Sequence, residues 1–241
     1  MDKGMYIDIG GYTLFAKLLG NKQNNVTVVF DSGYGDDSTS WDPVLKEVLK
    51  FTKVFVYDRA GIGKSEKSNL PRTSQNMVKE LNTLLISLNI SPPYVLVGHS
   101  FGGVNVRLYT DEYPEDIAGL VLVDTTPADY RETFLPTMSN EFQETYRKQF
   151  VYESDYNEFM ASLKQLKELK KELHLPMIVI SAGRKQHYSK QSQKLWNDMQ
   201  KQLSETSTKG EFVLASKSAH YIQNDQPEIV VQAIKRMCSK I

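Results

Sequence analysis

The sequence predicts an α/β protein with a mostly parallel sheet of about eight strands covered by helices. Short apolar runs recur along the 241-residue chain, and segments with apolar residues at helical spacing separate them. Such runs are typical of parallel strands that are buried on both faces. Several runs end in polar or glycine-rich turns, where the chemistry of open α/β sheets gathers. This alternation favours a sheet with helices on both sides.

Eight segments are predicted as strands. Residues 5–9 and 12–19 surround Gly10-Gly11, which predicts an antiparallel hairpin. The other six are short apolar runs of the kind found in buried strands. In chain order they are residues 26–30, 53–57, 94–97, 117–123, 176–181 and 211–215.

Helices are predicted between these strands from apolar residues at helical spacing. Segment 74–89 carries the strongest stripe, in which Met77, Leu81 and Leu85 share one face with two further leucines. Pro43 and Pro227 stand where proline fits the first turn of a helix. The predicted helices are residues 41–51, 74–89, 101–113, 191–203 and 227–237.

Segment 128–174 differs from the rest, because aromatic and charged residues mix there and no buried strand is predicted. Residues 156–166 carry an apolar helical stripe. We interpret 128–174 as an inserted helical cap on a core of residues 1–127 and 175–241. The aromatic side chains of the cap favour a pocket for an apolar substrate group. They are Tyr130, Phe134, Phe142, Tyr146, Phe150, Tyr152 and Phe159.

The composition limits the functions and the cellular compartments that we expect for the protein. Lys+Arg and Asp+Glu both number 29, so no net charge attracts nucleic acid. The single cysteine, Cys238, excludes an intramolecular disulfide and favours a reducing, cytoplasmic compartment. No stretch approaches the ~20 apolar residues of a membrane span, and residues 1–6 lack the apolar core of a signal peptide.

Two glycine-rich loops follow predicted strands. In loop 31–37 the dinucleotide-binding spacing fails, since Ser38 stands where the third glycine belongs. That loop is either a flexible turn or a donor of a backbone N–H to a nucleophile. Loop 58–65 ends in Gly-Lys-Ser, but Asp58 occupies the first glycine position of a phosphate-binding loop. A carboxylate there would face the phosphate, so a polar loop at the sheet edge is predicted.

The decisive motif is Gly98-His99-Ser100-Phe101-Gly102, between a predicted strand and a predicted helix. A strand that turns at once into a helix forces its tip residue to a positive φ and leaves no room for side chains beside it. Ser100 would then project from the sheet beside the N–H groups that begin the helix. The motif predicts a nucleophile for acyl transfer, and the alternative is an incidental serine in a tight turn.

Other reactive residues also stand just past predicted strands. Asp124 follows strand 117–123, and His220 follows strand 211–215. Because the carboxyl ends of parallel strands meet at one edge, these residues are expected near Ser100 and the loop at Gly33-Tyr34.

With these motifs, the chain resembles the α/β-hydrolase superfamily in its short, cap-bearing form. The resemblance implies Ser100 as nucleophile, His220 as general base, and the backbone N–H groups of Tyr34 and Phe101 as oxyanion hole. It implies a small-molecule substrate and no metal or cofactor. The segments that carry it are Ser32-Gly33-Tyr34-Gly35, residues 57–65, residues 98–102, and Ala219-His220-Tyr221-Ile222 before Gln226-Pro227-Glu228.

The acid is where the chain departs from the family pattern. In many members it follows the strand that is 176–181 here, but loop 182–187 has no carboxylate, and Asp198 lies inside a predicted helix. Some members place the acid one strand earlier, at the position of Asp124. Asp124 could instead brace the cap hinge, in which case Asp129, a water-mediated contact or no acid at all are the alternatives.

The predicted function is a serine hydrolase that cleaves a small, apolar ester or related acyl compound through an acyl-enzyme. Ser100 argues against epoxide and haloalkane hydrolases, which use a carboxylate at this position. Hydrolysis of a carbon–carbon bond, a lactone or a thioester stays open. So does a ligand-binding or signalling protein with slow turnover on the same fold. The sequence does not predict the oligomeric state.

Overall fold

The structure is a computed structural model that describes residues 4–20, 26–169 and 172–240. The remaining positions of the predicted core and cap (1–3, 21–25, 170–171 and 241) lie outside the described residues. One sheet contains the strands β1 (Met5–Asp8), β2 (Thr13–Leu19), β3 (Thr27–Asp31), β4 (Lys53–Tyr57), β5 (Tyr94–His99), β6 (Ile117–Val123), β7 (Leu173–Ala182) and β8 (Ser207–Ala215).

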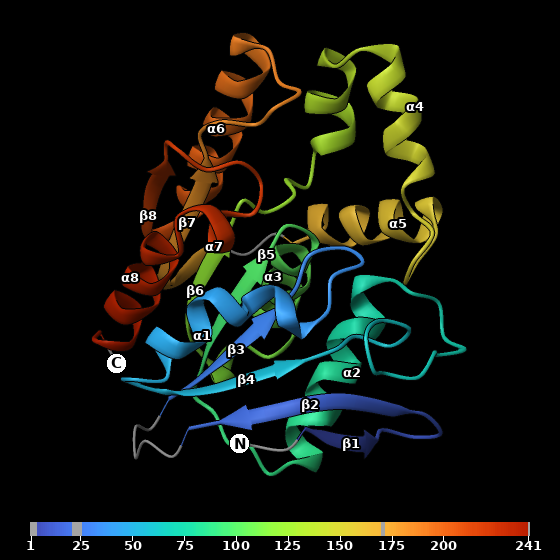
Figure 1. The fold of residues 1–241 in the computed structure, drawn as a ribbon, viewed down its shortest axis with the longest axis vertical. Coiled ribbons are helices and arrows are strands. Elements are labelled where there is room, and N and C mark those ends of the chain that lie inside the picture. The colour runs from blue at the N-terminus through green and yellow to red at the C-terminus, as the bar shows by residue number, and fades with distance from the viewer. Residues whose placement is uncertain (1–3, 21–25, 170–171, 241) are drawn as a thin grey trace.

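The strand order is β1-β2-β4-β3-β5-β6-β7-β8 (Figure 1). The pairs β1–β2 and β2–β4 are antiparallel, and the other neighbours are parallel. The prediction of a mostly parallel sheet of about eight strands is therefore confirmed. The predicted hairpin is also present as β1 and β2.

Strands β7 and β8 begin earlier than the sequence predicted, at Leu173 and Ser207 instead of residues 176 and 211. Most of the added residues are partly or fully exposed, although Ser207 is buried. Apolar character reports the buried part of a strand, whereas backbone pairing extends further along an edge. Leu173 pairs with Ser207 at this extension.

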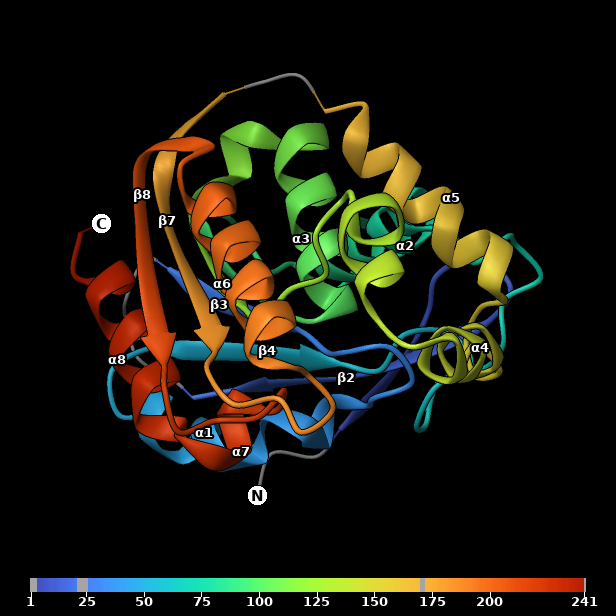
Figure 2. The same cartoon turned by 90° about the horizontal axis from the view of Figure 1, so that it is seen from above.

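Helices cover both faces of the sheet (Figure 2). α1 and α8 lie on one face, where strand residues such as Val28 and Phe30 contact them. α2, α3 and α6 lie on the other, against residues such as Val29. The helices are α1 (Asp42–Val48), α2 (Ser74–Ser87), α3 (Phe101–Glu112), α6 (Lys190–Ser204), α7 (Ile222–Asp225) and α8 (Pro227–Cys238).

Two details of the helices differ from expectation or add to it. The helix expected over residues 41–51 is shorter, because a 3₁₀ turn (Ser38–Trp41) precedes α1 and only turns follow Val48. None of the helices in the described parts of the chain is both long and apolar enough to cross a membrane.

The segment after β6 contributes a π turn (Tyr130–Phe134), a 3₁₀ turn (Leu135–Thr137), α4 (Asn140–Lys148) and α5 (Tyr156–Lys167). These elements lie beyond the ends toward which the central strands point (Figure 1). A third apolar cluster joins them to α3 and α6. The sequence did not predict α4, because its apolar face is limited to Phe142 and Tyr146, which are both only partly buried. The division into core and cap stays a prediction, and residues 173–174 belong to β7.

The strand order places a switch point between β3 and β5. From β3 the chain first adds β4 on one side and then returns to add β5 on the other. In open α/β sheets, ligands bind outside the carboxyl ends of the strands at such a point. Loop 32–36 follows β3 there, and Ser100 follows β5.

Candidate active site

Ser100 occupies the sharp turn between β5 and α3, with φ 51° and ψ −114°. The two glycines of the motif are needed for space. A Cβ on Gly98 would stand 2.6 Å from the Gly102 carbonyl oxygen, and a Cβ on Gly102 would stand 2.2 Å from the Asp31 carbonyl oxygen. The positive φ expected for the tip residue is thus observed, and the backbone holds the serine in a conformation that few L-residues adopt.

Hydrogen bonds around Ser100 fix the direction of the next peptide N–H. The Ser100 carbonyl oxygen accepts from Gly103 N, Thr126 N and Thr125 Oγ1, each at 3.1 Å. In a trans peptide the C=O and the following N–H point in opposite directions, so the Phe101 N–H points away from these donors. As the first residue of α3, Phe101 also has no intrahelical acceptor for its N–H.

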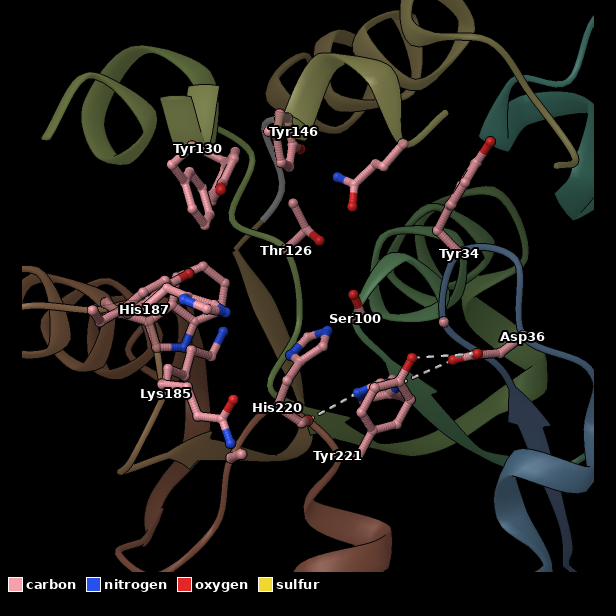
Figure 3. A pocket seen from close by; sticks show the side chains of 18 of the residues that line it. Tyr34, Asp36, Ser100, Thr126, Tyr130, Tyr146, Lys185, His187, His220 and Tyr221 are labelled. Atoms are coloured by element: carbon pink, nitrogen blue, oxygen red, sulfur yellow. Dashed lines mark hydrogen bonds and ion pairs between the residues drawn. The ribbon is translucent and has the colours of Figure 1, made fainter. Parts of the chain in front are cut away.

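His220 and Asp124 are in direct contact. The His220 Nδ1 lies 2.6 Å from Asp124 Oδ2. Asp124 is fully buried just after β6, and His220 lies on the loop after β8. A carboxylate only accepts hydrogen bonds, so Nδ1 carries the proton and Nε2 is left as a base. Ser100 and His220 line one cavity, which both side chains enter in Figure 3.

His99, the histidine of the Gly98–Gly102 motif, contacts the loop that carries His220. His99 Nε2 lies 3.0 Å from the His220 carbonyl oxygen, and the two rings are 4.6 Å apart between centroids. The side chain of His99 is buried. His99 therefore links the turn at Ser100 to the loop of the base.

The cavity has a volume of about 460 Å³. Five of the aromatic residues that the sequence assigned to the cap line it: Tyr130, Phe142, Tyr146, Phe150 and Phe159. The other two do not, because Phe134 is buried in the apolar cluster and Tyr152 is 67% exposed. Sequence reasoning missed further lining residues outside the predicted cap, namely Lys185, His187, Tyr188, Trp196 and Tyr221.

Comparison with known proteins identifies the family of this chain. The sequence profile of a family described as alpha/beta hydrolase fold matches residues 26–227. This chain belongs to the α/β-hydrolase family. The "Uncharacterized protein YqjL" of Bacillus subtilis (strain 168) is 35% identical over 215 residues, which are 88% of this chain and 83% of that protein.

Solved structures share the fold of this α/β hydrolase at low sequence identity. Alpha/beta hydrolase domain-containing protein 10 from mouse superposes with a TM-score of 0.76 at 16% identity, over 99% of each chain. A thermophilic esterase from Thermogutta terrifontis superposes with a TM-score of 0.69 at 21% identity, over 99% of this chain and 98% of the esterase.

In this hydrolase, Asp124 has more partners than the histidine alone. Its Oδ1 accepts from Ala182 N at 3.0 Å and from Trp196 Nε1 at 2.6 Å. Its Oδ2 also lies 2.7 Å from Lys185 Nζ. Burial alone would raise the pKa of Asp124, but the Lys185 ammonium and His220 hold it well below its usual range. The carboxylate is therefore ionised at neutral pH.

Lys185 comes from the loop after β7, in which the sequence offered no carboxylate. Its ammonium also lies 3.4 Å from the centroid of the Trp196 ring. Burial lowers the pKa of Lys185, and Asp124 opposes that change. The loop after β7, where many family members carry the acid, thus carries a lysine here, and its ammonium pairs with Asp124 from the preceding strand.

The other carboxylates considered in the sequence have different partners. Asp129 Oδ2 accepts from Thr133 Oγ1 at 2.9 Å. Asp198 forms an exposed ion pair with Lys194 on α6. Among these three carboxylates, the structure pairs Asp124 with His220.

The buried His99 predicts a pH dependence of stability in this hydrolase. Burial, followed by the nearby His220, lowers the pKa of His99 to about 3 from an ordinary 6.5. Below pH 6.5 the unfolded chain therefore binds a proton at His99 that the folded chain does not bind. The free energy of unfolding consequently decreases as the pH falls from 6.5 toward 3. The expected slope from this residue is about 1.4 kcal/mol per pH unit.

Urea unfolding between pH 7 and pH 4 measures this slope in the wild type and in His99→Gln, which keeps a side-chain donor. The wild-type free energy of unfolding should fall more steeply with acid than that of the variant. Equal slopes would show that His99 titrates normally in the folded protein.

Proposed function

We propose that this protein is a serine hydrolase that cleaves small, apolar esters. Ser100 is the nucleophile, His220 the general base and Asp124 the acid that orients it, with the N–H groups of Tyr34 and Phe101 as the oxyanion hole. One observation carries the proposal. The buried Asp124 carboxylate holds His220 Nδ1 at 2.6 Å, at the edge of a cavity that a serine with positive φ also lines.

The reaction follows from these groups. Ser100 Oγ attacks the ester carbonyl while its proton moves to His220 Nε2. The negative charge on the carbonyl oxygen is stabilised by the two backbone N–H groups. The C–O bond of the ester then breaks, and the alcohol leaves with the proton from Nε2. A water molecule then gives a proton to the same nitrogen and attacks the acyl carbonyl. The bond to Ser100 Oγ breaks, the serine recovers the proton from Nε2, and the acid product leaves.

Cavity shape and lining support an apolar substrate group. Phenylalanine, tyrosine and tryptophan make up nine of the twenty lining residues, and a volume of about 460 Å³ suits a small molecule. An esterase is among the proteins that share the fold. The carboxylic ester is the simplest substrate that meets both conditions.

A ligand-binding protein with slow turnover is the second candidate, and the Lys185 contact favours it. The Asp124 carboxylate is already paired with an ammonium group 2.7 Å away. Its charge is therefore partly neutralised before His220 takes up a proton in the reaction. A weaker stabilisation of the imidazolium slows the chemical step without preventing ligand binding.

Labelling with a fluorophosphonate probe tests the proposal, because such probes phosphonylate an activated serine. We expect one label per molecule of wild type, no label on Ser100→Ala, and full labelling of Ser87→Ala, which changes an exposed serine on α2. Absence of label on a folded wild type, or equal labelling of Ser100→Ala, would refute the proposed hydrolase. Rapid labelling with negligible turnover of a panel of p-nitrophenyl esters would favour the second candidate.

A further inference from the structure

A buried guanidinium lies beneath the loop that carries Tyr34. Arg59, just after β4, uses all five of its N–H donors. Nη1 donates to Asp31 Oδ1 at 2.5 Å and to the Ser32 carbonyl oxygen at 2.7 Å. Nη2 donates to the Gly33 carbonyl oxygen and to Glu153 Oε1, each at 2.6 Å. Nε donates to Glu153 Oε2 at 2.6 Å.

These contacts set the orientation of the Gly33–Tyr34 peptide. The only cis peptide bond in the described residues is Pro92–Pro93, so this one is trans. The Gly33 carbonyl is held by Arg59 and by Asp36 N at 3.1 Å. Because C=O and N–H are opposed across a trans peptide, the Tyr34 N–H points away from the guanidinium. Arg59 thus holds the peptide unit that would supply one oxyanion-hole donor.

Arg59 is itself held by a residue from the connection between α4 and α5. Glu153 is 4% exposed and forms a bidentate contact with the guanidinium, a geometry that restricts both groups. Glu153 Oε1 also accepts from Gly35 N at 2.9 Å. One carboxylate therefore binds both the arginine and the loop that the arginine orients.

Further contacts join the same two segments. The Tyr34 hydroxyl donates to the Ser154 carbonyl oxygen at 2.6 Å and accepts from Tyr152 N at 3.1 Å. A Cβ on Gly35 would stand 2.8 Å from the Tyr152 ring, so the segments are in close contact. Residues 152–154 thus restrain the loop after β3 through its backbone, through Tyr34 and through Arg59, which binds that loop.

We propose that Arg59, held by Glu153, is a positioning residue that aims the Tyr34 N–H into the oxyanion hole, so that residues 152–154 complete the catalytic site. The catalytic consequence rests on the proposed serine hydrolase. The orientation of the peptide does not, because it follows from the contacts alone. Burial of such charged groups lowers the stability of a protein unless they are well paired and hydrogen-bonded. Here the cluster fixes the plane of the Gly33–Tyr34 peptide.

Two variants weaken the cluster in different ways. Glu153→Gln removes the charge and puts an amide donor near Arg59 and Gly35 N. Arg59→Lys keeps the charge but loses the planar fork that reaches five acceptors. Glu80→Gln is the matched control, since Glu80 is 5% exposed and pairs with Arg72 in a separate buried contact. Each variant should lose some stability for the same electrostatic reason.

The rate constant of fluorophosphonate labelling is the first readout, and kcat and KM for a cleaved ester are the second. Removal of one oxyanion donor costs about 10²–10³-fold in kcat, and misdirection of that donor should cost about 10–100-fold. We expect this loss in Glu153→Gln and Arg59→Lys, with KM changed little. Glu80→Gln should label within about twofold of wild type. Wild-type labelling rates in both cluster variants would overturn the inference.

The Tyr34 N–H residual dipolar coupling, measured by NMR in aligned samples, separates this inference from the proposed function. If the wild type does not label at all, the hydrolase proposal fails and this coupling decides alone. A changed coupling in Glu153→Gln, but not in Glu80→Gln, supports the positioning role of the cluster. If the coupling is unchanged in folded Glu153→Gln, as in folded Glu80→Gln, the positioning role is refuted.

Discussion

Replacement of Asp124 by asparagine should lower kcat for ester hydrolysis by about 10⁴-fold, as expected when a catalytic histidine loses its carboxylate. The asparagine amide can donate to His220 Nδ1, which favours the tautomer with the proton on Nε2. That nitrogen could then no longer accept the Ser100 proton. Stopped-flow labelling and steady-state kinetics measure the loss, and circular dichroism checks the fold.

Asp129→Asn is the matched control, because Asp129 was the other acid that the sequence left open. It should retain nearly full activity, since its contact is with Thr133. Asp124→Asn also leaves the Lys185 ammonium without its carboxylate, a destabilising change. The double variant Asp124→Asn/Lys185→Met removes that charge and should recover stability but not activity. If Asp124→Asn labels as fast as wild type, Asp124 is not the acid.

Replacement of Gly102 by alanine should cost more than about 4 kcal/mol of the free energy of unfolding, which is an exceptional loss for one methyl group. The added Cβ would stand 2.2 Å from the Asp31 carbonyl oxygen and 2.6 Å from that of Ser32. Both acceptors belong to the backbone at the end of β3. The first turn of α3 would have to move away from the end of β3 to admit the methyl group.

Gly11→Ala separates this clash from backbone strain. Gly11 has φ +107°, but nothing lies within 4 Å of a Cβ built there. Its substitution should cost only about 1–2 kcal/mol. Urea denaturation of the two variants beside wild type gives both numbers. A loss at Gly102 no larger than that at Gly11 would show that the elbow has room for a methyl group.

Local patterns predicted the sheet and the turn at Ser100 well, for a physical reason. Strands such as β5 are buried on both faces, so their apolar runs stand out in the sequence. Gly98 is required by a contact with Gly102 within the turn itself, and the φ of Ser100 is a property of that turn, whereas Gly102 is required by the backbone at the end of β3. By contrast, α4 is a short helix whose apolar face consists of two partly buried aromatic residues, too few to stand out in the sequence.

The sequence offered Asp124 and His220 as partners, but the contacts of Lys185 and Glu153 could not be predicted in the same way. Asp124 meets His220 and Lys185 because β6, β7 and β8 are neighbours, and that order is a property of the whole sheet. Glu153 lies in a short connection without any motif, yet it is among the most buried carboxylates of the chain. Contacts between distant segments decide such roles, and a single sequence does not contain them.

The position of Trp196 gives the protein an optical reporter of its own cavity. The chain has two tryptophans, and Trp41 is fully buried against Phe30 on the opposite side of the sheet from α6. Trp196 lines the cavity, and its indole lies against the Lys185 ammonium. A molecule that enters the cavity alters the polarity and charge around this ring directly, whereas Trp41 is separated from the cavity by the His99 ring. In Trp41→Phe, intrinsic emission would therefore follow occupancy of the site directly, for substrates that are turned over and for ligands that are not.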